Sequence, residues 1–360
     1  MRNIKNYKKS VNNFFLCSIV ILMLFFSSCS VSSLGIRVLV PAEVTVNKEI
    51  KHIGIVNRSL PANKRKLINI VEGFISGESI LADRFGSENC LKGLAGKLNN
   101  SPRFSAVIIQ GENLRGTGTR MFPNPLSWRT VEKLCNKYRI DALIALETFD
   151  SNITLDKDIR MKKKTIKDKK TKTKKKVKVP QYIANLYIQV NSGWKIYDPS
   201  TRSIVDANTY MDEKSWYATG KSRRESLRNL PDKRDAINQA GYYSGIQYGM
   251  RISPTWINVN RQYYVKGCSE FKMAERCVKS GDWAQAISIW EKLLHNNDIE
   301  IAGRAAYNLA FAAEIRGDFQ NALKWAKRSY AEFGNKKAHS YMRILNQRIS
   351  DKEHLEEQLR

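Results

Sequence analysis

Histidine and cysteine have the widest catalytic and metal-binding repertoire of the side chains, and this chain has four histidines and six cysteines. No CxxC pair occurs, and the histidines have no metal-ligand spacing with one another or with a cysteine. No GxSxG, HExxH, GxGxxG or Walker sequence is present. The sequence therefore predicts no metal site, no cofactor and no catalytic residues. The histidines are His52, His295, His339 and His354.

Two pairs of carboxylates could in principle share acid–base work, Asp141 with Glu147 and Asp206 with Asp212. Each pair falls at the edge of an expected strand, where no positional logic brings both groups to one reacting atom. The glycine-rich stretch 111–120, "GENLRGTGTR", lacks the lysine of a phosphate-binding loop, and we interpret it as a turn-rich loop. We expect a non-enzymatic protein; a hydrolase of envelope glycans is the alternative, without a recognisable site.

The amino terminus has the parts of a secretory signal. Four basic residues between positions 2 and 9 precede the apolar run 14–26, and small residues follow. Thirteen residues rise only ~20 Å as a helix, which is short of the ~30 Å hydrocarbon core of a bilayer. A transmembrane helix is therefore not expected here.

The end of this signal, "FSSC" at 26–29, resembles a bacterial lipobox, with Phe26 in place of the commonest Leu. The resemblance implies that the signal peptide, 1–28, is removed and that Cys29 is acylated with fatty acids such as palmitate. Several acyl chains bury enough methylene groups for stable membrane anchoring. Acidic residues are absent from 30–42, which favours an outer-membrane site facing the periplasm over surface export. The alternative is an ordinary secretory signal with an incidental cysteine.

Four other cysteines would remain in the mature chain, in an export compartment that permits disulfides. Each lies in an apolar helical pattern, where a buried free thiol behaves as a small hydrophobic side chain. The sequence leaves their pairing open. They are Cys90, Cys135, Cys268 and Cys277.

Residues 29–50 are expected to form a tether and an extended segment, and 51–260 an α/β domain. Strands are expected at 51–57, 104–110 and 141–150, with helices between them. The predicted helices cover 65–75, 87–104 with Ser87 as N-cap, and 126–140 with Ser127 as N-cap. The stretches 181–191, 193–210 and 214–220 are expected to form antiparallel strands separated by turns at Asn191-Ser192-Gly193 and Asp198-Pro199-Ser200. A helix at 232–254 follows, with Gly245 as a close-packing position. This order predicts an α+β fold in which helices pack on one mixed sheet.

The phrases "LNNSPRFSAV" and "YRIDALIALE" give this domain a resemblance to the TolB amino-terminal domain and the curli-secretion lipoprotein family. That resemblance implies, as an alternative function, a subunit of an outer-membrane secretion or assembly complex. The phrases "VLVPAEVTV", "IGIVNRSLP" and "WKIYDPSTRSIVD" are similar to those of a Bacteroidota lipoprotein family classed as a domain of unknown function.

Residues 261–348 contain two copies of a helical pattern with a period of 36 residues, beginning at Gly281 and Gly317. Each copy has an aromatic residue two positions on and an alanine three further on, and the first also has Trp290. The pattern resembles the tetratricopeptide repeat, which implies an all-α array of helical hairpins that docks a protein partner or stabilises the first domain. The polar tail, 349–360, is expected to fray. The shared positions are Trp283, Ala286, Phe319 and Ala322.

The formal net charge is +27, and its densest part is the insert 157–179. The insert has almost no large apolar residues, so it is expected to be disordered. It lacks aromatic residues for base stacking, and an exported lipoprotein rarely meets nucleic acid, so nucleic acid is not the expected partner. Anionic phospholipid or lipopolysaccharide phosphate is the candidate ligand, and a merely solvated loop is the alternative. The candidate contact residues are Lys162, Lys163, Lys164, Lys174, Lys175 and Lys176.

These observations predict an envelope lipoprotein that is anchored through acylated Cys29 and that scaffolds protein partners through its helical repeats.

Overall fold

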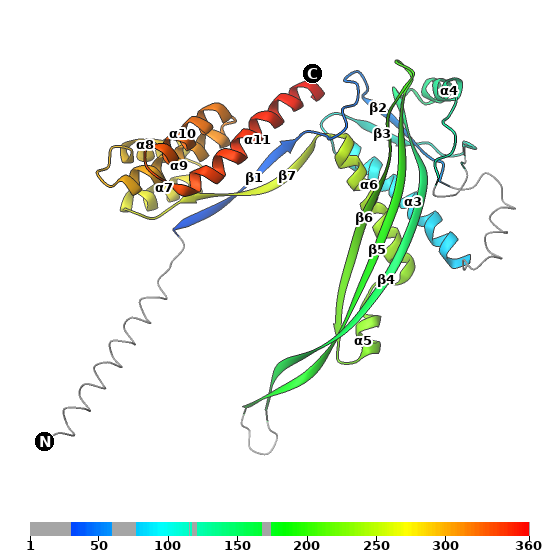
Figure 1. The fold of residues 1–360 in the computed structure, drawn as a ribbon, viewed down its shortest axis with the longest axis horizontal. Helices are drawn as coiled ribbons and strands as arrows, with labels where there is room; N and C mark the ends of the chain where they lie inside the picture. Colours follow the sequence, from blue (N-terminus) through cyan, green and yellow to red (C-terminus); the bar gives the residue numbers. More distant parts are fainter. Residues whose placement is uncertain (1–29, 60–76, 115, 117–120, 168–173, 360) are drawn as a thin grey trace. The chain divides into compact units, whose positions relative to one another are not determined.

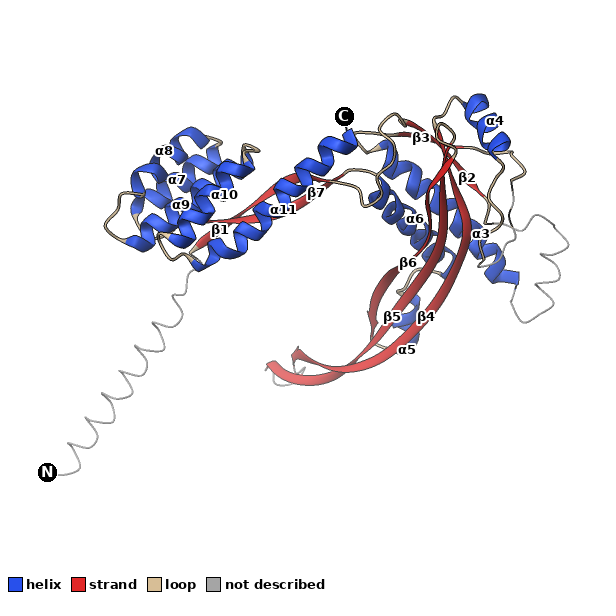
Figure 2. Cartoon of the chain, turned by 45° about the horizontal axis from the view of Figure 1, so that its top comes forward, coloured by secondary structure: helices blue, strands red, loops and turns tan. Residues whose placement is uncertain are grey.

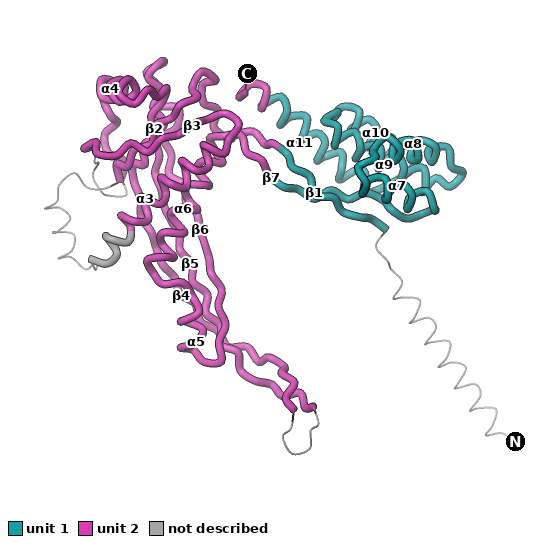
Figure 3. Tube along the Cα trace, turned by 180° about the vertical axis from the view of Figure 1, so that it is seen from behind, with its two compact units in different colours: residues 1–38, 257–353 teal, residues 39–256, 354–360 magenta. Residues whose placement is uncertain are grey.

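The computed structural model describes residues 30–59, 77–114, 116, 121–167 and 174–359. The chain divides into two compact units (Figure 3): unit 1 is 1–38 with 257–353, and unit 2 is 39–256 with 354–360. The predicted signal peptide, Cys29 and the expected helix at 65–75 lie outside the described residues. Within the described parts of the chain, no helix is long and apolar enough to cross a membrane.

Unit 2 is built on a five-stranded mixed sheet with the strand order β3-β2-β4-β5-β6 (Figure 1). β2 pairs in parallel with β3 and β4, whereas β4, β5 and β6 are antiparallel. The predicted α+β fold with a mixed sheet is thereby confirmed. The strands are β2 (His52–Asn57), β3 (Ser105–Ile108), β4 (Ala142–Lys167), β5 (Lys174–Asp198) and β6 (Ser203–Gly220).

Helices cover both faces of the inner part of this sheet. On one face, α3 (Gly77–Asn99) and α6 (Lys233–Ile252) share a core with Ile144 and Trp194. On the other face, α4 (Trp128–Tyr138) packs on Leu143. Neighbouring residues of a strand point to opposite faces, so the continuous apolar run at the start of β4 is buried on both sides.

Glycines allow α3 and α6 to approach closely. A Cβ on Gly245 would overlap the carbonyl oxygen of Cys90, and a Cβ on Gly93 would overlap that of Tyr242. Gly245 therefore has the predicted close-packing role, because the backbones of the two helices are in contact at this position.

Two expected boundaries in unit 2 are wrong. Ser87 is not an N-cap: it lies inside α3, is buried, and donates its hydroxyl to the Arg84 carbonyl at 2.8 Å. The predicted turn at Asn191-Ser192-Gly193 is absent, because β5 runs straight through it. Gly193 serves instead for close approach, since a Cβ there would overlap the hydroxyl of Thr148.

Unit 1 is an all-helical array packed on a pair of strands. The strands β1 (Val31–Val40) and β7 (Thr255–Tyr264) form a two-stranded sheet, and each runs a short way into unit 2. Five helices follow, which confirms the predicted α-helical region. They are α7 (Ser269–Ser280), α8 (Trp283–Leu293), α9 (Ile299–Ile315), α10 (Phe319–Ala331) and α11 (Lys336–Leu359).

The carboxy-terminal tail, 349–360, does not fray as expected, because α11 continues to Leu359. Gln358 is buried, and its amide both donates to the carbonyl and accepts from the N–H of Ala42, each at 2.9 Å. Satisfied, buried polar contacts of this kind hold a polar sequence in a helix that composition alone would leave loose.

Candidate anion-binding ribbon

The Lys-rich insert forms the outer half of a long two-stranded ribbon. β4 and β5 stay paired out to Lys167 opposite Lys174, whereas β6 ends at Gly220, opposite Tyr182 (Figure 2). The expectation that 157–179 is disordered is therefore wrong for 157–167 and 174–179. β-Branched residues such as Thr165 and Val177 alternate with lysines there, and such residues favour an extended backbone.

Beyond the end of β6, every charged side chain of the described ribbon is positive. Its two strands, 160–167 and 174–181, contain nine basic side chains and no acidic one. All nine are exposed. We call this segment the basic ribbon; its cations are Arg160, Lys162, Lys163, Lys164, Lys167, Lys174, Lys175, Lys176 and Lys178.

Strand register gives the basic ribbon two different faces. Directly opposed residues share a face, and alternate residues of one strand point the same way. One face, the lysine face, combines five lysines with Thr165, Met161 and Pro180. The other, the mixed face, combines lysines with apolar Ile166, Val177 and Val179. The cations of the lysine face are Lys163, Lys167, Lys174, Lys176 and Lys178, and those of the mixed face are Arg160, Lys162, Lys164 and Lys175.

Two pairs of lysines lie directly opposite each other on the lysine face, Lys163 with Lys178 and Lys167 with Lys174. Like charges in such cross-strand positions destabilise a ribbon. A bound polyanion would remove this repulsion. Lysines and Pro180 at free strand edges also hinder edge-to-edge aggregation, which is an alternative reason for their presence.

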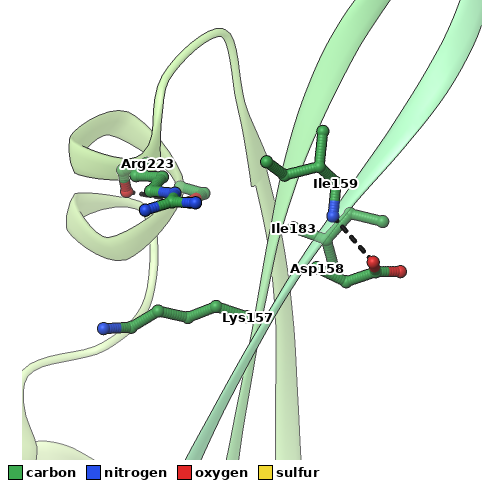
Figure 4. Close-up of a pocket in the computed structure, with 6 residues that line it drawn as sticks. Lys157, Asp158, Ile159, Ile183 and Arg223 are labelled. Carbon is green, nitrogen blue, oxygen red and sulfur yellow. Dashed lines mark hydrogen bonds between the residues drawn. The ribbon is translucent and has the colours of Figure 1, made fainter.

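A hollow of about 300 Å³ lies at the base of the ribbon (Figure 4). Lys157 and Arg223 of α5 (Arg223–Arg228) contribute cations to its lining, whereas the Asp158 carboxylate accepts from the Ile159 N–H at 2.7 Å. The hollow therefore adds two basic groups and one acid next to the basic ribbon. Ile183 and Ser226 complete its lining.

The predicted repeat-packing residues all lie in unit 1. Gly281 and Gly317 adopt positive φ angles of 82° and 76° at turns between helices. The Trp283 ring packs edge-on against Phe311, with centroids 5.7 Å apart. Ala286, Ala322 and Trp290 are fully buried, whereas Phe319 is half-buried beneath Arg348. The five side chains pack between helices, and the two glycines form the turns that join them.

A residue that the sequence did not single out, Asn308, makes a two-bond contact with the backbone in unit 1. It is fully buried on α9 and binds both backbone groups of Tyr264, accepting from the N–H and donating to the C=O, each at 2.7 Å. Tyr263 stacks on Phe311 in the same core, with centroids 5.4 Å apart. The helices of unit 1 thus bind β7, an extended strand of the same chain, through hydrogen bonds and ring stacking.

The carboxylates considered for catalysis are occupied by fixed partners. Glu147 is buried, binds Arg58 Nη1 through both oxygens at 2.8 and 2.7 Å, and accepts from the Tyr197 hydroxyl at 2.8 Å. Asp141 accepts from the backbone N–H groups of Lys51 and His52. The proposed pair Asp141–Glu147 is therefore divided between two separate hydrogen-bond sets.

The second pair is divided in the same way. Asp206 accepts from the Tyr248 hydroxyl at 2.8 Å, whereas Asp212 accepts from Ser244 at 2.8 Å and pairs with Arg251 at 3.3 Å. Burial, with Asp206 nearby, raises the pKa of Tyr248 well above its usual value. Both carboxylates fix α6 to the sheet.

The four described cysteines are free thiols. Burial raises the pKa of Cys135 to about 11 and raises that of Cys90 further, so both are poor nucleophiles at neutral pH. Among the residues that the structure covers, no cluster of three His, Cys, Asp or Glu side chains could hold a metal ion.

The chain combines a mixed α+β unit with a largely helical unit that also contains most of β1 and β7. Residues 50–264 match the family "Domain of unknown function (DUF8603)", and the chain belongs to this family. Residues 272–347 match "Domain of unknown function (DUF6340)". No curated protein matches the chain. A solved structure, a neuraminyllactose-binding hemagglutinin homologue from Helicobacter pylori, is similar at 11% identity and a TM-score of 0.23, over 58% of this chain and 87% of that chain.

Proposed function

We propose that this chain is a non-enzymatic envelope lipoprotein, anchored at acylated Cys29 in the outer membrane facing the periplasm, whose basic ribbon binds an anionic surface. The observation that carries the proposal is the ribbon itself: two paired strands with nine cations and no acid, of which Arg160 is paired with a carboxylate beyond the segment, that of Asp158 at 3.1 Å. Directly opposed lysines on one face cost stability when nothing neutralises them, and a bound anionic surface would remove that cost.

The ligand that fits best is the phosphate layer of lipopolysaccharide or of anionic phospholipid. Each Lys or Arg near such a surface contributes about 1 kcal/mol at moderate salt, so several of them suffice to orient an anchored protein. Nucleic acid fits less well, because the described strands of the ribbon contain no aromatic side chain for base stacking.

The helical unit is the scaffolding part of the proposal. Its helix pairs and the glycine–aromatic–alanine pattern support tetratricopeptide-like repeats, and the order of strands and helices in unit 2 supports a TolB-like or curli-secretion-like domain. Asn308 already holds Tyr264, so a partner peptide would need a surface other than the one that β7 occupies. A subunit role in a secretion or assembly complex is the alternative within the same class.

Vesicle binding tests the ribbon directly. The chain from Ser30 onward, which lacks both the apolar run 14–26 and the anchor, is mixed with vesicles of phosphatidylglycerol or phosphatidylcholine and separated by flotation. Substituting Lys163, Lys176 and Lys178 by Gln should weaken binding to the anionic vesicles by about 100-fold at low salt, because about 3 kcal/mol is lost.

The matched control removes the same charge from exposed lysines of unit 1, namely Lys272, Lys324 and Lys327. It should bind almost as well as the parent chain. Equal losses in the two triple variants would show that only net charge matters. Binding to both lipids without preference, or to neither, would refute the proposed ligand.

A further inference from the structure

The first described residues are held by the helical unit. The N–H of Val265 donates to the carbonyl of Ser30 at 3.1 Å, and the Ser32 side chain is hydrogen-bonded to Tyr263. Val31 and Leu34 pack against the helical core. The sequence predicted a tether and an extended segment over 29–50, and the extended strand β1 already begins at Val31. A free tether is therefore absent from Ser30 onward.

The partner strand of β1 is fixed just as firmly. Besides the two bonds between Asn308 and its backbone, Tyr264 bonds Asn335 through its hydroxyl at 3.1 Å. Arg304 donates to the Lys266 carbonyl at 2.8 Å, one residue beyond the contact with Ser30. The β1–β7 pair is thus an integral layer of the helical unit at this end.

We infer that the helical unit is seated directly on the lipid headgroups, with the turn 265–268 at the bilayer surface. This inference rests on the proposed acylation of Cys29. Consecutive Cα atoms are about 3.8 Å apart, so a lipidated Cys29 stands one such step from Ser30. The headgroup layer is about 5–8 Å thick on each side of the hydrocarbon core. One residue between the anchor and the folded unit is too short to cross this layer, so the unit must lie against the headgroups.

The side chains around this end fit a lipid surface that carries negative charge. The Arg304 guanidinium and the Lys337 ammonium lie 5.4 and 5.5 Å from the Tyr264 ring centroid, and Lys337 is exposed. Arg304 is paired with Glu300, which offsets part of its charge. Tyr264 is buried and Arg304 is half-buried, so Lys337 is the member of this group that is exposed beside the anchor. An exposed cation in this position is suited to an anionic headgroup layer.

A spacer insertion tests this seating. The acylated full chain, with a fluorescent amino acid in place of Lys337, is reconstituted into vesicles that contain headgroup-quencher lipid. The seated unit should be strongly quenched. Inserting twenty Gly/Ser residues between Cys29 and Ser30 gives a coil with a reach of about 25 Å, and the quenching should then fall at least about five-fold.

A second reporter position makes the result specific. Lys352 is also exposed and lies fifteen residues further along α11, which is about 22 Å at the helical rise. A reporter there should be less quenched than one at Lys337. Quenching at Lys337 that is unchanged by the spacer, or equal at the two positions, would overturn the inference. A chain that carries no acyl mass and does not float would overturn the proposed function as well, so the two failures are distinguishable.

Discussion

Asn308 of α9 holds Tyr264 of β7 by both of its backbone groups, each at 2.7 Å, inside the core of the helical unit. An amide side chain that pairs with both backbone groups of one residue mimics a neighbouring strand, so the helices bind β7 as they would an extended peptide. These two hydrogen bonds explain how the helices and the β1–β7 strands form one packed unit.

Replacing Asn308 by Ala should destabilise unit 1 by on the order of 2–4 kcal/mol, because it leaves a buried N–H and a buried C=O of Tyr264 unpaired. Hydrogen exchange at the Tyr264 amide is the direct readout, and its protection should fall. Asn321→Ala, at an exposed position of α10, should change stability by no more than about 0.5 kcal/mol. Unaltered exchange at Tyr264 in Asn308→Ala would contradict this contact.

The buried ion pair between Arg58 and Glu147 provides a second prediction. Glu147→Gln should cost about 3–5 kcal/mol of unfolding free energy, because Arg58 would be left charged and buried. Glu132→Gln makes the same chemical change in an exposed pair with Arg202 and should cost less than about 1 kcal/mol. Urea denaturation of both variants measures the difference, and similar costs would show that burial of the pair is unimportant.

The close approach of α3 and α6 provides a third prediction. Gly245→Ala should cost about 3 kcal/mol or more, since its Cβ would overlap the backbone of Cys90. Gly96→Ala on α3 has only an ordinary contact, 3.6 Å from the Tyr242 hydroxyl, and should be neutral or stabilising by up to about 1 kcal/mol. Thermal unfolding compares the two, and a tolerated Gly245→Ala would mean that the helices are further apart.

Asp83 should make stability depend on pH. Burial, with a smaller contribution from Asp150, raises its pKa to about 6 in the folded chain, and a hydrogen bond from Ser151 only partly offsets this. Between pH 4 and 6 the folded carboxyl keeps a proton that the unfolded chain has released. Stability therefore falls as pH rises through this window and stays lower above it.

Asp83→Asn should flatten this pH dependence and raise stability at pH 7 by about 1–2 kcal/mol. Asp156→Asn, on an exposed part of β4, is the charge-matched control. Unfolding free energies at pH 4, 5, 6 and 7 provide the test. The interpretation fails if the two variants alter the slope alike, or if stability rises between pH 4 and 6 in the parent chain.

Local sequence signals predicted the elements that local physics decides. Ser127 caps α4 as expected, with its hydroxyl accepting from the Thr130 N–H. The glycine at 281 ends α7 in the left-handed conformation, and α8 begins two residues later. These features depend on a few adjacent residues, so they can be predicted from a single sequence.

Features that depend on residues far apart in the chain could not be predicted from the sequence. Ser87 looks like a helix start, but α3 extends upstream of it and the residue is buried. The Lys-rich insert looks disordered by composition, yet each of its strands satisfies the backbone of the other. Asn308 is separated by 44 residues from the strand that it binds, and nothing in the local pattern marks it.

The claim on which the account most depends is the covalent anchor at Cys29, and intact-mass measurement of the chain purified from its native envelope tests it most directly. We expect a chain that begins at Cys29 and is heavier than the polypeptide by a diacylglyceryl group and an amide-linked fatty acid. A mass that includes residues 1–28, or one that begins at or before Cys29 without any acyl group, would contradict it.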